Sequence, residues 1–547
     1  MKARPFGALA LFLSFLVPTL LAPTAEGAPP KLELVIDERT LGNTVPLKEW
    51  TSKRPSLADV NGDGRLELLS QNENGRVYVI DTRTGKALAE LATRYPYGPD
   101  LGPFNGVVAA DLDGDGAVEV VAVNRAAVVT AWRVEAANGS SDSLAFRFLW
   151  DRHLNQFHGK PTADAGAVLG DLDGDGSFEL VIQTEEKGVY ALRHNGSVLW
   201  ALPEWGGNAE AKLADVNRDG ALDAVFFTDG GIAYAVDGPT GRILWKYELR
   251  HRGVWPGSIP SPGVVADVDG DGRVEVAACA RNVENATESY APGAPYYRQH
   301  HFVLFLAREN RSIWREKPSW GNPLCSAYLL GHDVDGDGKV ELFGMDWNTI
   351  GHKPGNWAVT GRPHVFAFRH DGRELWHATT DHGNAKPHIA LADWDGDGKQ
   401  DVVAYGRGRL IAYDALTGAP RGELWLSTGD VKQGPLFADL DGDGTLEVVV
   451  AVVGAKNAFL VYDLGPRSTP PAWPGWDLPI PDPPGEPPRP SPGVPDATAP
   501  PPEGAGPTEA TKAPGPRERG DEPPRETVLP LLLVVAALLL VAAGRRP

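Results

Sequence analysis

A nine-residue phrase rich in acidic side chains occurs eight times in this chain of 547 residues. Every copy has Asp or Asn at positions 1, 3 and 5, Gly at position 6 and an acid at position 9. The copies begin at Asp59, Asp111, Asp171, Asp215, Asp267, Asp333, Asp393 and Asp439. Ca²⁺ takes six to eight oxygen ligands at flexible geometry, whereas Mg²⁺ demands a stricter octahedron and more water. The phrase therefore predicts up to eight structural calcium loops.

The predicted ligands are the side chains at positions 1, 3, 5 and 9 of each copy. They are Asp59, Asn61, Asp63, Glu67, Asp111, Asp113, Asp115, Glu119, Asp171, Asp173, Asp175, Glu179, Asp215, Asn217, Asp219, Asp223, Asp267, Asp269, Asp271, Glu275, Asp333, Asp335, Asp337, Glu341, Asp393, Asp395, Asp397, Asp401, Asp439, Asp441, Asp443 and Glu447. An EF-hand would also need a bidentate Glu at position 12. That position holds a residue without a carboxylate in every copy, such as Ser70 or Val450.

The residues that flank each phrase have the pattern of strands. The segments 106–110 and 118–123 are rich in Val and Ala and show no helical period. A second hairpin follows each phrase, as in 75–85, so every repeat supplies four strands. Successive phrases start 44 to 66 residues apart, which is the length of one propeller blade. The sequence thus predicts an all-β fold, an eight-bladed β-propeller.

Two further features concern how such a ring would be held together. The eighth repeat has only three strands before a Pro-rich stretch begins, and Lys31 to Leu41 is predicted to add the missing outer strand. Aromatic residues of the outer strands are predicted to pack between neighbouring blades: Trp200, Trp245, Trp314 and Trp376.

With these loops and the hairpins that follow them, the chain resembles FG-GAP or VCBS repeat propellers over residues 31–465, including the head of integrin α chains. The resemblance implies calcium in the loops, but the family includes adhesins, receptors and enzymes, so it leaves function open. The second hairpins also resemble quinoprotein repeats, although the vicinal cysteine pair of some quinone enzymes is absent. Eight-bladed calcium propellers also occur among rhamnogalacturonan lyases. No G-x-S-x-G, H-E-x-x-H or phosphate-loop motif is present.

The two ends of the sequence predict export and membrane attachment. Residues 1–27 have the layout of a secretory signal peptide, with a signal anchor as the alternative. Residues 466–526 form a Pro-rich stalk that cannot bury a core. Residues 528–544 are apolar enough for a transmembrane helix, and Arg545 and Arg546 give 545–547 the character of a cytoplasmic tail. A processed lipid-anchor signal is the alternative there. The propeller is thus expected outside the cell, at its surface.

Charge and cysteine content limit the partners. The formal net charge is −20, and the eight phrases hold 30 of the 72 acidic residues, so bound calcium would offset most of it. No basic stripe suits nucleic acid. Cys279 and Cys325 are the only cysteines, and an exported chain permits either a disulfide or two free thiols.

The predicted ligand-binding face is the one opposite the calcium loops. Longer connections are expected in blade five, around 282–300, and in blade six, around 349–363, and long loops on a rigid scaffold often carry function. The candidate ligand-binding residues are Tyr296, Tyr297, Arg298, His300, His301, Trp357, Trp255, Trp320 and His382. Loops that only cover blade edges are the alternative. We therefore expect a surface protein that binds an extracellular glycan or protein in an adhesive or receptor-like role, with a polysaccharide lyase or related carbohydrate-active enzyme as the alternative.

Overall fold

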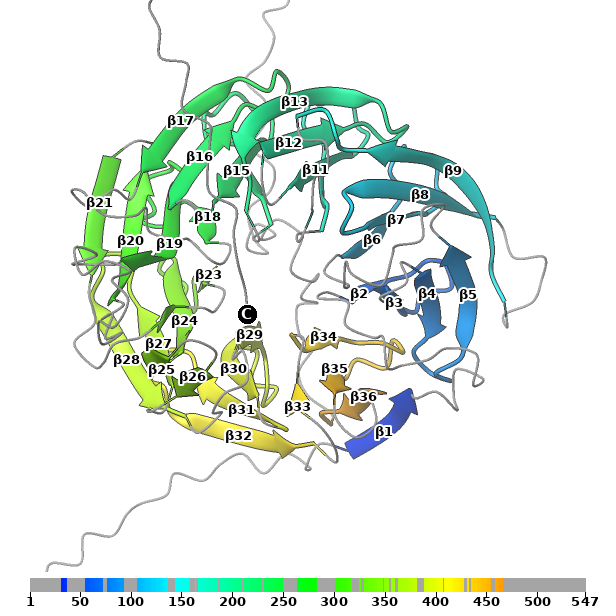
Figure 1. Ribbon diagram of the computed structural model, residues 1–547. Helices are drawn as coiled ribbons and strands as arrows, with labels where there is room; N and C mark the ends of the chain where they lie inside the picture. The colour runs from blue at the N-terminus through cyan, green and yellow to red at the C-terminus, as the bar shows by residue number, and fades with distance from the viewer. Residues whose placement is uncertain are drawn as a thin grey trace, which may run out of the picture. The chain divides into compact units, whose positions relative to one another are not determined.

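The computed structural model of the protein describes most of the chain from Lys31 to Gly465 and contains strands and turns (Figure 1). The larger stretches outside the described residues are 1–30, 37–54, 93–105, 136–142, 249–262, 283–300, 317–323, 381–387 and 466–547. The predicted signal peptide, stalk, transmembrane helix and tail all fall in these stretches. Within the described residues, no helix is long and apolar enough to cross a membrane.

The described strands form eight antiparallel blades arranged in a ring, which confirms the predicted eight-bladed propeller (Figure 1). Blade 1 comprises β2 (Ser56–Ala58), β3 (Glu67–Gln71), β4 (Arg76–Asp81) and β5 (Ala87–Ala92). Blade 2 comprises β6 (Val107–Ala110), β7 (Glu119–Val123), β8 (Val128–Glu135) and β9 (Ala145–His153). Blade 3 comprises β10 (Val168–Gly170), β11 (Glu179–Gln183), β12 (Lys187–Leu192) and β13 (Val198–Trp205). Blade 4 comprises β14 (Lys212–Ala214), β15 (Asp223–Phe227), β16 (Ile232–Val236) and β17 (Ile243–Glu248).

The second half of the ring repeats this order with some additions. Blade 5 comprises β18 (Val264–Ala266), β19 (Glu275–Asn282), β20 (His301–Arg308) and β21 (Arg311–Glu316). Blade 6 comprises β23 (Leu330–His332), β24 (Glu341–Trp347), β27 (His364–Phe368) and β28 (Glu374–Thr379), with β22 (Leu324–Cys325) added beside β24. Blade 7 comprises β29 (His388–Ala392), β30 (Asp401–Gly406), β31 (Arg409–Asp414) and β32 (Pro420–Trp425). Blade 8 comprises β34 (Leu436–Ala438), β35 (Glu447–Val453), β36 (Ala458–Asp463) and β1 (Lys31–Ile36), with β33 (Asp430–Val431) also beside β35.

The N-terminal strand closes the last blade. β1 pairs antiparallel with β36, with Lys31 opposite Asp463 and Ile36 opposite Phe459. The predicted closing strand is thereby confirmed for residues 31–36, and residues 37–41 lie outside the described part. The first and last strands of the propeller therefore pair in one sheet. This pairing covers the edge of β36, which would otherwise be exposed.

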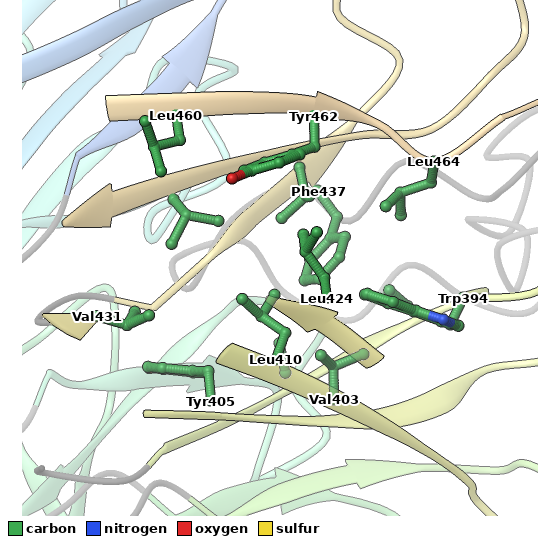
Figure 2. Packing of buried hydrophobic residues seen from close by; sticks show 14 of the residues in the cluster. Trp394, Val403, Tyr405, Leu410, Leu424, Val431, Phe437, Leu460, Tyr462 and Leu464 are labelled. Atoms are coloured by element: carbon green, nitrogen blue, oxygen red, sulfur yellow. The ribbon is translucent and has the colours of Figure 1, made fainter. Parts of the chain in front are cut away.

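Each neighbouring pair of blades shares one buried hydrophobic cluster, so eight clusters hold eight blades. Figure 2 shows the cluster between blades 7 and 8, where Tyr405 and Leu410 face Leu460 and Tyr462 across the interface. A further cluster joins blade 8 to blade 1 and includes Ile36 of the closing strand. The core is therefore a circle of inter-blade layers, as a closed ring of sheets requires.

Tryptophans of the outer strands link one blade to the next. The indole Nε1 groups of Trp200, Trp314 and Trp376 donate to backbone oxygens of Gly238, His370 and Ala415 in the following blades. Trp245 packs at the interface of blades 4 and 5. The predicted packing role of all four is confirmed. Trp150 makes the same contact to His194, although the sequence reasoning did not single it out.

Blades 5 and 6 are joined by an additional element. Cys279 in β19 is disulfide-bonded, which resolves the alternative that the sequence left open, since Cys325 in β22 is the only other cysteine. The backbones of β19 and β22 lie in contact. The insertion expected in blade 6 contains a hairpin of β25 (Thr349–Lys353) and β26 (Asn356–Val359) rather than loop alone. The strand-forming segments there are short, and their pairing was not evident from the sequence.

Candidate metal centres

Each acidic phrase occupies the same place in its blade. It begins on the residue directly after the first strand, as Asp59 follows β2, and its ninth residue opens the second strand, as Glu67 opens β3. All eight phrases have this position. The predicted position of each acidic loop within a β-hairpin is therefore confirmed, and connections of this kind lie at one face of the ring.

The backbone of each loop is held by the acids of the phrase. The ninth acid accepts a hydrogen bond from the backbone N–H of the second residue at 2.7–3.3 Å in all eight loops. The first Asp accepts one from the Gly at position 6 at 2.6–3.1 Å. The fifth-position Asp accepts one from the seventh residue at 2.7–3.0 Å. These hydrogen bonds fix the acids at positions 1, 5 and 9 to the backbone of their own loop, and the first Asp uses both oxygens in several loops, as Asp59 does.

The turn inside each loop needs a left-handed backbone at positions 4 and 6. In the first loop Gly62 and Gly64 have φ of 74° and 84°, values that glycine adopts without a Cβ penalty. The fourth loop has Arg218 at position 4, also with a positive φ of 64°. This loop therefore pays a conformational penalty that the other seven avoid.

The ninth acids are buried and carry an electrostatic cost in the absence of a cation. Glu179 and Glu341 have no exposed surface, and their Oε1 atoms have no hydrogen-bond partner among the described residues. Burial, reinforced by neighbouring loop carboxylates, raises the pKa of both to about 7. The same causes raise the pKa of Asp401 to about 8. A bound cation would favour the ionised form of each, so buried unpaired carboxylate oxygens fit a metal site.

The carboxylates converge closely enough to hold an ion. Oxygen atoms of the acids at positions 1, 3 and 9 lie within 4.8 Å of one another in blades 3, 6 and 7, as for Asp171, Asp173 and Glu179. In blades 2 and 5 the converging acids are those at positions 1, 3 and 5. The donor set is wholly oxygen, which suits a hard cation such as Ca²⁺.

A position that the sequence analysis did not consider faces the ninth acid from the third strand. Asp81 lies opposite Glu67, whereas Arg133 lies opposite Glu119. The residue opposite the ninth acid could be found from the sequence by counting outward from the turn between the second and third strands. This count is uncertain because the turn differs in length between blades.

The candidate ligand-binding residues are not tested by the structure. Tyr296, Tyr297, Arg298, His300, Trp255, Trp320 and His382 lie outside the described residues. The backbone places His301 at the start of β20 and Trp357 in β26. Both residues lie in or next to the connection between the second and third strands of their blade. In an antiparallel blade this connection lies at the face opposite the acidic loop.

The fold and its loops define an eight-bladed β-propeller with an acidic hairpin loop in every blade. The sequence profile described as FG-GAP-like repeat matches residues 59–122, 333–404 and 393–450. Each matched stretch begins on the first Asp of a loop, so the chain carries FG-GAP-like repeats, as the resemblance implied.

Solved structures support the fold alone, because their sequence identities are low. The V. cholerae biofilm matrix protein Bap1 is 15% identical with a TM-score of 0.52, covering 82% of this chain and 93% of that one. Quinohemoprotein alcohol dehydrogenase from Comamonas testosteroni is 12% identical with a TM-score of 0.50, covering 80% and 77%. Saccharomyces cerevisiae Sqt1 is 10% identical with a TM-score of 0.50, covering 79% and 99%. No curated protein sequence matches the chain significantly.

Proposed function

We propose that this chain is a calcium-stabilised propeller that binds an extracellular glycan or protein at a cell surface, in an adhesive or receptor-like role. The observation that carries the proposal is that the acidic loops and the long connections lie at opposite faces of the ring. All eight acidic loops lie at one face, and the longer connections of blades 5 and 6 belong to the other face.

Calcium is proposed as a structural ion. Two observations support it: the Oε1 atoms of Glu179 and Glu341 have no hydrogen-bond partner among the described residues, and the carboxylates at positions 1, 3 and 9 converge in blades 3, 6 and 7. The ion would supply positive charge that allows buried, clustered carboxylates to remain ionised. The acids at positions 1, 3, 5 and 9 would hold it.

The face opposite the loops is proposed as the ligand-binding face. Its connections in blades 5 and 6 are longer than in the other blades, and the blade 6 connection contains the hairpin β25–β26. Bap1, which shares the fold, is a biofilm matrix protein, a setting that agrees with an adhesive role. Surface location is proposed from the signal-like residues 1–27, the Pro-rich 466–526 and the apolar 528–544.

The binding proposal can be tested with the full-length chain on an array of neutral and acidic polysaccharides, with ultraviolet absorbance of any released products measured in parallel. Binding without product release supports the proposal, whereas unsaturated products would replace it by a lyase activity. Arg298→Ala and Trp357→Ala are expected to weaken binding at least tenfold. Arg311→Ala is the matched control, because this exposed arginine follows the third strand of blade 5 and lies at the face of the acidic loops.

The surface location has its own test. Protease added to intact cells should remove an epitope placed within the Pro-rich residues 466–526 but spare one placed after residue 545. Protection of the first epitope would contradict an external propeller.

A further inference from the structure

The residue opposite the ninth acid divides the eight loops into two groups. In blades 1, 7 and 8 it is Asp81, Asp414 and Asp463. The register of blade 4 gives Asp237 at the same place. In the other four blades the registers give an arginine: Arg133, Arg193, Arg308 and Arg369. Half of the loops therefore face an acid and half face a cation that belongs to the chain itself.

Two of these arginines reach into the centre of their loops. Arg133 contacts Asp113 at 3.1 Å through Nη2 and Glu119 at 2.7 Å through Nε, and it also pairs with Asp115. In blade 5, Arg308 contacts the acids at the same three positions. Its Nη2 lies 3.3 Å from Asp269 and 2.8 Å from Asp271, and its Nε lies 2.5 Å from Glu275.

The arginines of blades 3 and 6 stay at the edge of their loops. Arg193 contacts one loop acid, Asp173, at 3.3 Å. Arg369 contacts Asp335 at 3.8 Å. Among the described residues, neither forms an ion pair with the ninth acid of its loop, whereas Arg133 and Arg308 both do. The same type of residue at the same position therefore has two different geometries.

The geometry of the metal-ligand groups separates the blades in the same way. In blades 3 and 6 the ninth acid belongs to the converging group, together with the acids at positions 1 and 3. In blades 2 and 5 the converging group consists of the three Asp residues at positions 1, 3 and 5, and the ninth acid is paired with arginine instead. The guanidinium thus holds a carboxylate that a calcium ion would need.

A guanidinium close to three carboxylates stabilises their ionised forms, as a bound metal cation would. Its planar fork forms charge-assisted hydrogen bonds, and it carries its charge at every physiological pH. A calcium ion entering the same loop would have to displace the arginine or bear its repulsion. In blade 7, Arg421 reaches the loop from β32 and lies 3.2, 3.8 and 3.9 Å from Asp395, Asp397 and Asp401, the acids at positions 3, 5 and 9. Blade 7 differs because Arg421 is also paired with an additional acid, Asp414, which offsets its charge, and because Asp401 remains in the converging group.

We propose that Arg133 and Arg308 take the place of calcium in blades 2 and 5, so that the saturated propeller holds six ions rather than eight. This inference rests on the proposed calcium binding of the other loops. It makes blades 2 and 5 independent of calcium supply, whereas the remaining loops depend on it.

The number of bound ions is the direct test. Native mass spectrometry of the full-length chain equilibrated with CaCl₂ should show six Ca²⁺ per chain. Arg133→Met and Arg308→Met should each add one ion, and the double variant should add two. Arg369→Met is the matched control and should leave the count at six, because Arg369 touches one acid at the loop edge.

Melting of the same variants supplies a second readout. Without calcium, Arg133→Met and Arg308→Met should melt below the control, and calcium should restore both. A wild-type count of eight, an unchanged count in both variants, or a loss of Tm that calcium does not restore would overturn the inference. A wild-type chain that binds no calcium would instead overturn the proposed function of the loops.

Discussion

The indole Nε1 of Trp200 donates a 2.7 Å hydrogen bond to the backbone oxygen of Gly238, which belongs to the next blade. Trp200 is buried, and its ring lies against Gly241 in the turn that follows Gly238. A Cβ on Gly241 would come within 2.7 Å of the tryptophan side chain. The contact therefore combines an inter-blade hydrogen bond with a close approach that only glycine permits.

Loss of the Trp200 hydrogen bond, together with the smaller side chain that its removal requires, should lower the stability of the propeller. Trp200→Phe keeps an aromatic ring but leaves the Gly238 oxygen without its donor, so we expect a loss of about 1–3 kcal/mol in the free energy of unfolding. Urea unfolding followed by circular dichroism would measure it. Trp425→Phe is the control, since Trp425 is 61% exposed and should change stability by less than about 0.5 kcal/mol. Equal losses in both variants would contradict an inter-blade role.

The closing strand offers a second matched pair. Ile36 has no exposed surface and packs in the cluster between blades 8 and 1, so Ile36→Ala should cost about 2–5 kcal/mol. Leu32 lies in the same strand but is 37% exposed, and Leu32→Ala should cost much less. Thermal unfolding of both variants would compare them. If Ile36→Ala melts like the wild type, β1 does not hold the ring closed.

The repeated part of the fold could be predicted from the sequence because each blade contains its own copy of the acidic phrase. A phrase such as that of residues 59–67 fixes the turn, the end of one strand and the start of the next, so eight phrases give eight blades. The closing strand was predictable from the missing fourth strand of the last repeat. The structure adds little to this scaffold beyond its exact strand ends.

What could not be predicted depends on register and on packing between distant segments. Whether Arg133 faces the centre of its loop depends on strand pairing 14 residues beyond Glu119, through a hairpin whose turn length varies between blades. The pairing of β25 with β26 and the bonded state of Cys279 likewise depend on an insertion without a repeat to follow. The candidate ligand-binding residues remain predictions, because all of them except His301 and Trp357 lie outside the described residues.

Replacing the left-handed Arg218 of the fourth loop by glycine should increase the stability of the protein. Arg218 has a φ of 64° where all seven other loops have glycine, and a left-handed non-glycine residue costs about 1–2 kcal/mol. Arg218→Gly is therefore expected to stabilise the protein by about 1 kcal/mol, measured by urea unfolding in calcium. Arg218→Ala removes the same charge but keeps the backbone penalty, so it should show no such gain. A gain of equal size in both variants would assign the effect to charge instead.

The buried ninth acids predict how the metal-free protein responds to pH. Burial raises the pKa of Glu67, Glu179, Glu341 and Glu447 from 4.5 to about 7. Between these values the folded state binds more protons than the unfolded state, so its stability falls as pH rises. Dialysed, calcium-free protein should therefore melt at a higher temperature at pH 5 than at pH 8, whereas calcium should raise Tm more at pH 8. The variant Glu179→Gln should flatten the calcium-free pH dependence, and Glu135→Gln, which changes an exposed acid, should not. A calcium-free Tm that increases from pH 5 to pH 8 would contradict the idea that these carboxylates, when ionised, destabilise the folded protein without a bound ion.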